Sequence, residues 1–255
     1  MITSGIDVGV ESTKAVILQD GKIIGQGIGL SGGAARPAAI EAIYEKALAE
    51  ANIAAADVEK VVSTGKGKYN AGMTDKPVTE TVVAAKLAKH VCPDATMVVS
   101  IGSDEIIVAV LGEDDKIIEF AINQKCAAGL GRFLKSMTRR LDMTLEEMSA
   151  LPKANGAIVN DGCIVFAELD ALSLLNHGTP AKEVAAALIE AIAVRANSVL
   201  DEMTAPNTAK VVLIGGMTKN AAFIRELKER SGIDFIIPEN AEFASALGAA
   251  LVATQ

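Results

Sequence analysis

Apolar runs and tight turns alternate along the chain in a pattern that occurs twice. Residues 5–24, GIDVGVESTKAVILQDGKII, contain three apolar runs separated by a glycine turn and an Asp-Gly turn. This pattern predicts a β-meander with hairpin turns. Residues 98–118, VVSIGSDEIIVAVLGEDDKII, repeat it, with VSIG in place of IDVG at an offset of 93 and DDKII in place of DGKII at an offset of 94. The repetition indicates an internal duplication.

The remaining elements follow from helical periodicity and from short β-branched runs. Helices are expected over 37–51, 78–91, 130–150, 164–177, 180–204, 219–231 and 241–254, and strands over 57–63, 211–216 and 233–237. Strands that alternate with helices are typical of the α/β class. We place a first lobe at 1–95 and a second at 96–255, and we expect the C-terminal helix 241–254 to pack back on the first lobe.

Composition narrows the choice of partners. The chain has 255 residues, with 24 Lys and Arg against 32 Asp and Glu, a formal charge of −8, no Trp and 3% aromatic residues. Nucleic-acid and anionic-membrane binding need a basic surface, and base-stacking platforms need aromatic side chains. We therefore expect neither nucleic acid nor a membrane as a partner.

Features of targeting are also missing from the sequence. The N-terminus has no basic segment followed by a long apolar one, and no apolar run approaches the ~18 residues of a membrane span. Three cysteines are too few for a disulfide framework in a chain of this length. These features predict a cytoplasmic protein whose thiols are inert, reactive or metal-bound.

The turn between the first two predicted strands has the composition of a phosphate site. It contains Asp7, Gly9, Ser12, Thr13 and Lys14. Glycine lets backbone N–H groups approach a phosphate, hydroxyls and a lysine add donors, and an Asp at a strand end can hold Mg²⁺ through water. The alternative is an ordinary hairpin turn.

A second glycine turn lies near the C-terminus, in VVLIGGMTKN at 211–220. There a buried strand enters Gly215-Gly216 and then a helix that follows Asn220. A turn without side chains suits the flat face of a base and ribose. Gly248 permits a similar close approach, although packing between helices explains it equally well.

Two cysteines each precede a helical stretch, Cys126 in KCAAGLGRF at 125–133 and Cys163 in GCIVFAE at 162–168. A helix N-terminus stabilises a thiolate and the negative charge of a bound cluster. A [4Fe–4S] cluster takes four cysteines, so two per chain would suffice only in a twofold-symmetric dimer. The alternative is a pair of buried cysteines that act as small hydrophobes.

The duplicated meander and the glycine turns resemble the actin-like ATPase and sugar-kinase superfamily, whose two lobes clamp ATP in the cleft between them. The resemblance implies a duplicated actin-like (sugar kinase/Hsp70-type) α/β fold. It also implies that the first-lobe turn and its second-lobe echo at Gly102 bind phosphates with Mg²⁺. The Gly215-Gly216 turn, Asn220 and Gly248 would then lie at the nucleoside.

The two cysteine segments closely resemble those of the activator ATPases of 2-hydroxyacyl-CoA dehydratases, which form one family with the ATP-binding subunits of benzoyl-CoA reductases. The likeness runs over nearly the whole chain. It implies that Cys126 and Cys163 ligate one [4Fe–4S] cluster shared in a homodimer or by paired homologous subunits, with Gly129 and Gly131 among the cofactor-binding residues. It further implies ATP and ADP as nucleotides, ferredoxin or flavodoxin as electron source, and an acyl-CoA dehydratase or reductase as partner.

The sequence departs from that family at the second phosphate turn. Most relatives read like D-I-G-G-Q-D, whereas this chain has Ser100-Ile101-Gly102-Ser103-Asp104, one residue shorter and without the leading acid. A carboxylate is the expected ligand of Mg²⁺ or of the attacking water. Either Asp104 replaces it through a shift of the turn, or Ser100 marks slow or absent hydrolysis. A His that usually follows Glu80 is missing too.

The sequence therefore predicts an ATP-dependent, low-potential electron donor. Two alternatives remain: a hydrolysis-deficient paralogous subunit of such a complex, and a small-molecule kinase of the same fold. The turn Thr64-Gly65-Lys66-Gly67-Lys68, which resembles a turn of the family, faces a phosphate or a partner protein, or is a solvated loop.

Overall fold

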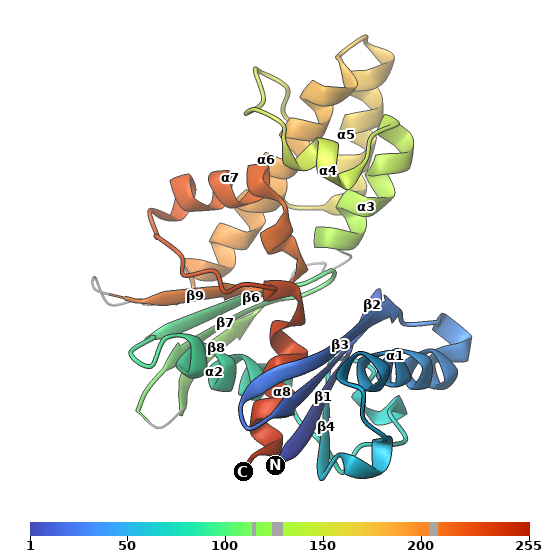
Figure 1. The fold of residues 1–255 in the computed structure, drawn as a ribbon. Helices are drawn as coiled ribbons and strands as arrows, with labels where there is room; N and C mark the ends of the chain where they lie inside the picture. The colour runs from blue at the N-terminus through green and yellow to red at the C-terminus, as the bar shows by residue number, and fades with distance from the viewer. Residues whose placement is uncertain (114–115, 124–129, 204–208) are drawn as a thin grey trace. The chain divides into compact units, whose positions relative to one another are not determined.

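The structure is a computed structural model that describes residues 1–113, 116–123, 130–203 and 209–255. The chain divides into two compact units (Figure 1). The first unit comprises Met1–Ala95, Leu111–Ile118 and Pro238–Gln255, and the second comprises Thr96–Val110 and Glu119–Ile237. The last residues of the chain thus belong to the first unit.

A five-stranded sheet forms the first unit, in the order β3-β2-β1-β4-β5. Its strands are β1 (Ile2–Val8), β2 (Ser12–Gln19), β3 (Lys22–Leu30), β4 (Lys60–Thr64) and β5 (Lys76–Pro77). Strand β1 pairs antiparallel with β2 and parallel with β4. Since the carboxyl ends of parallel neighbours meet at one edge of a sheet, the turns that follow β1 and β4 lie close together.

The first unit has three helices, α1 (Arg36–Ala51), α2 (Glu80–Val91) and α8 (Ala244–Ala253). Helices α1 and α8 pack on the sheet, and α2 packs on α8. Helix α1 packs on β2 and β3, and its Ile40 and Tyr44 join Ile6 and Ile17 of the sheet in one apolar core. Helix α8 contacts β1, β4 and α2, as Figure 1 shows for the red C-terminal helix beside β1.

The contact between β1 and α8 is close because the side chains that face each other there are small. Gly5 faces the alanine-rich helix, and a Cβ added to it would lie 2.0 Å from the carbonyl oxygen of Ala246 and 2.3 Å from the amide nitrogen of Ala250. Both are backbone atoms, which cannot rotate away as the end of a side chain can. Only glycine fits this position.

We expect Gly5→Ala to destabilise the protein by at least about 3 kcal/mol, since overpacking costs about 1–3 kcal/mol even where side chains can adjust. The matched control is Gly72→Ala, because a Cβ at Gly72 meets no atom within 4 Å. Thermal unfolding followed by circular dichroism measures both changes. Equal melting temperatures for the two variants would contradict the close contact.

The second unit holds a four-stranded sheet in the order β8-β7-β6-β9. Its strands are β6 (Met97–Ile101), β7 (Ile106–Leu111), β8 (Ile117–Ile122) and β9 (Val211–Ile214). Its helices are α3 (Leu130–Leu141), α4 (Leu145–Ser149), α5 (Ile164–Asn176), α6 (Ala181–Leu200) and α7 (Ala221–Ser231). The core of this unit surrounds α6, which buries twelve of its twenty residues.

The two sheets repeat one topology. In each, three consecutive antiparallel strands form a meander, and a later strand pairs parallel with the first of them, β4 with β1 and β9 with β6. The internal duplication predicted from the sequence is therefore a duplication of structure.

Two predicted elements differ from the structure. The helix predicted over 130–150 is broken between α3 and α4, where Asp142 has a φ of +51° and Thr144 caps α4 by accepting from the amide of Glu147. The strand predicted over 233–237 is a single bridge between Ile236 and Val212, because Pro238 has no N–H to continue the pairing.

Candidate functional site

The turn between β1 and β2 is held from behind by buried hydroxyls. The Gly9 amide donates to the Ser12 carbonyl at 3.2 Å, and the Ser31 hydroxyl donates to the Gly9 carbonyl at 2.7 Å. The Thr13 hydroxyl lies 3.0 Å from that of Ser31, and both side chains are buried. The structure thus places Thr13 beneath the turn, where it supports the turn together with Ser31, a residue that the sequence analysis did not identify.

Asp7 and Lys14 lie opposite each other on β1 and β2. The Lys14 Nζ is 3.6 Å from the Asp7 Oδ2, and the two side chains are only 13% and 15% exposed. Burial raises the pKa of the Asp7 carboxyl above its ordinary value, and the negative charge of Glu80 adds to the rise, whereas Lys14 opposes it. Asp7 is therefore a buried acid whose ionised form has one close cation.

The turn after β4 closes over Asp7. Gly65 has a φ of +88°, and a Cβ there would lie 2.7 Å from the Asp7 Oδ1. The Gly67 amide donates to the Val8 carbonyl at 2.9 Å. The sequence left this turn open between a solvated loop and a site; the structure brings it directly against the acid of the first turn.

Two charged side chains that the sequence analysis did not place in the site complete this cluster. The Lys68 Nζ is 3.8 Å from the Glu80 Oε2 and donates to the Gly65 carbonyl at 3.4 Å. Glu80 is the first residue of α2. The Gly-x-Gly-Lys spacing of the turn was the available signal, but it required the pairing of β4 with β1 to become interpretable.

We define the first-unit cluster as Asp7, Lys14, Lys68 and Glu80 around the two glycine turns. Backbone amides, lysines and glycines are suited to a polyphosphate, and carboxylates are suited to Mg²⁺ and its waters. The hydroxyl of Thr64, which is in register with Asp7, is buried and makes no hydrogen bond within the described residues. An unsatisfied buried hydroxyl beside this acid fits a site that accepts a ligand or ordered water.

The second-unit turn between β6 and β7 has the same length as the first. The Gly102 amide donates to the Glu105 carbonyl at 2.9 Å, as Gly9 does to Ser12, and both pairs are three residues apart. Ser100 therefore occupies the place of Asp7, opposite Ile107. No shift of the turn moves Asp104 into that place.

Asp104 instead forms an ion pair, and neither of its buried carboxylate oxygens makes a hydrogen bond within the described residues. The Arg132 Nη2 lies 2.7 Å from the Asp104 Oδ1, and the Arg132 amide donates to the Ser103 carbonyl at 3.2 Å. Arg132 belongs to the first turn of α3. The carboxylate thus joins the second-unit turn to the start of that helix.

Two other glycines of the second unit, Gly131 and Gly215, lie against this turn. A Cβ on Gly131 would lie 3.2 Å from the Ser103 Cα, and one on Gly215, whose φ is +103°, would lie 2.3 Å from the Ile101 carbonyl oxygen. Gly216 has no neighbour within 4 Å of an added Cβ. The buried Asn220 caps α7, since its side chain accepts from the Phe223 amide at 2.8 Å.

Gly248 has a different surrounding. It lies in α8 of the first unit, where a Cβ would be 2.3 Å from the Val83 carbonyl oxygen. The structure accounts for this glycine by the packing of α8 on α2.

Two of the three cysteines lie among the described residues. Cys163 is the N-cap residue of α5, half-buried and reduced, while Cys92 is buried at the end of α2 and donates to the Asp94 carboxylate at 3.0 Å. Cys126 and Gly129 lie outside the described residues. Among the described residues, no group of three or more potential metal ligands comes together.

Helix α5 presents an apolar surface next to Cys163. Val165, Phe166 and Leu169 are 60%, 58% and 56% exposed. Large apolar side chains exposed side by side are typical of a surface that binds another protein.

Within the described ranges, no helix combines the length and the apolar character needed to cross a membrane.

Comparison with known proteins identifies the family and the fold of the chain. The sequence profile of the BadF/BadG/BcrA/BcrD ATPase family matches residues 4–253. The activator of lactoyl-CoA dehydratase from Anaerotignum propionicum is 34% identical over 257 residues, which cover 99% of this chain and 97% of that protein.

Solved structures are similar over the same length. The activator of the 2-hydroxyisocaproyl-CoA dehydratase from Clostridium difficile, with bound ADPNP, has a TM-score of 0.89 at 29% identity and covers 99% of this chain and 94% of that chain. A ROK family glucokinase from Streptomyces griseus, in complex with glucose and AMPPNP, has a TM-score of 0.61 at 17% identity, with all of both chains covered, and is similar in fold alone. The predicted duplicated actin-like ATPase and sugar-kinase fold is confirmed.

Proposed function

Because the chain belongs to the BadF/BadG/BcrA/BcrD ATPase family, we propose that it hydrolyses ATP to deliver one low-potential electron to an acyl-CoA dehydratase or reductase. The electron donor is a [4Fe–4S] cluster shared by two copies of the chain or by paired homologous subunits, and it is recharged by a ferredoxin or flavodoxin. The observation that carries the ATP part of this proposal is the first-unit cluster, in which two acids and two lysines surround two glycine turns.

The first-unit cluster supplies the groups that phosphoryl transfer requires. Lys14 and Lys68 neutralise phosphate oxygens, and the glycine of the Gly9 turn lets the backbone approach them. Asp7 and Glu80 hold Mg²⁺ through its waters, since this ion usually keeps several waters in protein sites. Positioning and electrostatics account for most of the catalysis of such reactions, so a buried, preformed cluster is well suited to it.

In this proposal the Gly215-Gly216 turn of the second unit binds the nucleoside. Gly216 leaves open space where a side chain would stand, and the turn that contains it is fixed by the capping of α7 through Asn220. A base and ribose can lie flat against such a turn without displacing side chains.

The described part of the cysteine ligand set fits an iron–sulfur cluster. Cys163 lies at the N-terminus of a thirteen-residue helix, and its thiol is free of any disulfide. The positive end of the helix dipole stabilises the thiolate that iron requires. When bound, the cluster would supply one-electron chemistry at low potential. The apolar face of Val165, Phe166 and Leu169 supports a second copy of the chain beside this cysteine.

A specific observation also favours a second candidate, a hydrolysis-deficient subunit that binds ATP without hydrolysing it. The second-unit turn carries Ser100 in place of an acid, and Asp104 is engaged by Arg132 rather than directed to the position of Asp7. The first-unit acids would then be the only carboxylates at the phosphates within the described residues.

Hydrolysis measurements distinguish the two candidates. We expect slow ATP hydrolysis by the unmodified protein, a rise of about tenfold or more in Ser100→Asp, and little change in Asp104→Asn, because an acid in register with Asp7 can position Mg²⁺ or water. Calorimetry with ADP serves as the control for binding. Undetectable hydrolysis in Ser100→Asp, with nucleotide still bound, would favour the subunit that only binds ATP. No nucleotide binding at millimolar concentration would contradict both candidates.

A further inference from the structure

The segment that joins α4 to α5 runs from the Gly215-Gly216 turn, which we call the nucleoside turn, to Cys163. We define this connecting segment as residues 149–163. At its start, the Ser149 hydroxyl donates to the Lys219 carbonyl at 3.2 Å and accepts from the Ala221 amide at 2.8 Å. These partners are the end of the turn that begins at Gly215 and the first residue of α7. The connecting segment is therefore bonded to both sides of Asn220.

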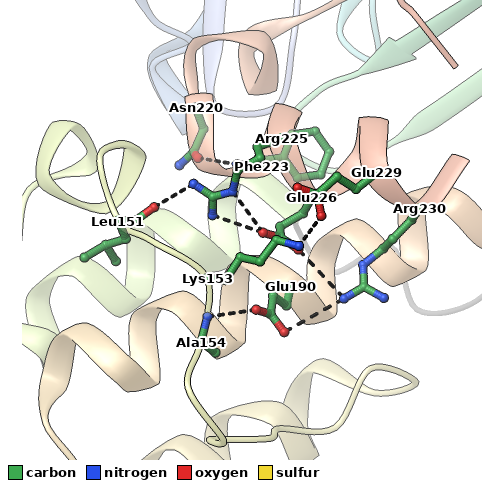
Figure 2. Close-up of polar contacts among 10 residues, drawn as sticks. All are labelled: Leu151, Lys153, Ala154, Glu190, Asn220, Phe223, Arg225, Glu226, Glu229 and Arg230. Atoms are coloured by element: carbon green, nitrogen blue, oxygen red, sulfur yellow. Dashed lines mark hydrogen bonds and ion pairs between the residues drawn. The ribbon is translucent and has the colours of Figure 1, made fainter. Parts of the chain in front are cut away.

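An ion pair between the partly exposed Arg225 and the buried Glu226 makes the next connection, shown in Figure 2. Arg225 donates from Nη1 to the Leu151 carbonyl at 2.9 Å, and from Nε and Nη2 to the Glu226 Oε1 at 3.2 and 3.0 Å. Glu226 is only 2% exposed, and its second oxygen lies 3.9 Å from the Arg230 Nη2. One guanidinium thus satisfies a buried acid on α7 and holds the connecting segment.

Further along the connecting segment, hydrogen bonds join it to α6. Its backbone amides at Ala154 and Ala157 donate to Glu190 and Glu183 of α6 at 2.8 and 3.0 Å. Arg195 of α6 donates to the carbonyls of Asn160 and Asp161.

At the other end of the segment, an asparagine reaches the cysteine. The Asn160 side chain accepts from the amide of Cys163 at 2.7 Å and from that of Gly162 at 3.0 Å. Hydrogen bonds spaced along the connecting segment thus tie it to α6, to α7 or to itself.

A purely structural purpose does not require a buried charge at Glu226. Well-packed apolar residues often stabilise a core as well as a buried ion pair does, and such pairs are better suited to fixing one arrangement of elements. The arrangement fixed here is the position of the connecting segment against α7. The two ends of that segment are the two places in this unit to which the proposed function assigns nucleotide and iron.

We propose that Arg225 and Glu226 are positioning residues that couple the nucleoside turn to Cys163 through the connecting segment. This inference rests on the proposed function, because it takes nucleotide to bind at the Gly215-Gly216 turn. A nucleotide that favours one position of α7 shifts the segment bonded to it, and the shift changes the surroundings of the Cys163 thiol. Coupling of this kind is reciprocal, so a change at Cys163 alters nucleotide affinity by the same factor.

The test uses the full chain after anaerobic removal of iron. Cys163 is alkylated with iodoacetamide in the presence and absence of ADP and Mg²⁺, and mass spectrometry of the peptides separates Cys163 from Cys92 and Cys126. We expect ADP to change the alkylation rate of Cys163 by at least about fivefold in the unmodified protein, the low end of typical coupling between sites. In Arg225→Lys and Glu226→Gln, we expect the ratio of the alkylation rates with and without ADP to fall to near one while ADP still binds.

The matched control is Lys228→Met, on the same helix, because Lys228 pairs with the exposed Asp234 and not with the connecting segment. It should keep the ratio of the unmodified protein. Ser149→Ala removes one hydroxyl at the start of the segment, should lower the ratio as well, and keeps the test decisive if a variant of the ion pair does not fold. As a second readout, alkylation of Cys163 should change the Kd for ADP in the unmodified protein and leave it nearly unchanged in Arg225→Lys and Glu226→Gln.

Two results would overturn the inference while leaving the proposed function intact: ADP binds without changing Cys163 in the unmodified protein, or the ratio survives in Ser149→Ala and in the folded variants of Arg225 and Glu226. Failure of the unmodified protein to bind ADP is a separate result, which would overturn the proposed function and the inference together.

Discussion

Cys163→Ser is expected to remove nearly all bound iron from the anaerobically purified protein. Cys163 is reduced, half-buried and located at the N-terminus of α5, where the helix dipole stabilises a thiolate. A serine hydroxyl remains protonated at neutral pH and does not replace a thiolate as a ligand of the cluster. Iron and acid-labile sulfide analysis should give about four iron atoms for two chains in the unmodified protein, together with a signal in the EPR spectrum of the reduced sample.

The matched control is Cys92→Ser. Cys92 is buried at the end of α2 and donates to Asp94, so its replacement should leave the iron content unchanged. If Cys92→Ser loses iron as completely as Cys163→Ser does, the assignment of the ligand is wrong. Cys126→Ser should behave like Cys163→Ser, because the resemblance to the activators pairs these two residues.

Asp7→Asn is expected to lower ATP hydrolysis by about a hundredfold, a loss typical of removing one preorganised electrostatic group. The amide keeps the shape of the side chain but loses the charge that holds Mg²⁺ and its waters. Hydrolysis at saturating ATP and Mg²⁺ measures the loss. The control is Asp20→Asn, which changes an exposed acid that pairs with the N-terminal amine and should leave hydrolysis as it was.

The same variant should be at least as stable as the unmodified protein. Burial raises the pKa of Asp7, so the folded state disfavours the ionised carboxylate. The stability that Asp7 contributes is therefore complete below the pKa it has in the unfolded chain, and it is lost as the pH rises through the higher pKa of the folded state. Asparagine stays neutral throughout that range.

Melting temperatures at pH 5 and pH 8, without nucleotide, test this directly. The advantage of Asp7→Asn over the unmodified protein should grow as the pH rises. A variant that melts earlier at pH 8 would show that its loss of hydrolysis comes from misfolding, and the functional interpretation of Asp7 would fail.

At the second phosphate turn, the sequence predicted the place of one residue but not the contacts of another. At the second turn, the repeat placed Ser100 at the position of Asp7, and the structure has the same register. The role of Asp104 as a replacement for the missing acid stays a prediction, but Ser100 and not Asp104 is in register with Asp7. The turns are equally long, and Asp104 pairs with Arg132, twenty-eight positions further along the chain. Such a pairing depends on where α3 begins, which no local pattern reveals.

The sequence by itself determined the features that depend on neighbouring residues: the two meanders, the glycine turns, and a cysteine directly before a helix. Strand period, turn chemistry and capping act over a few residues, so they can be predicted from a short segment. Only the tertiary structure decided which of these features meet. Asp7 and the Gly65–Lys68 turn meet because β4 pairs with β1 across more than fifty residues, and the contacts from Ser149 to Lys219 and from Arg225 to Leu151 span 70 and 74 residues. Contacts at that separation are selected by the packing of the whole unit, which compensates for the entropy lost in closing long loops.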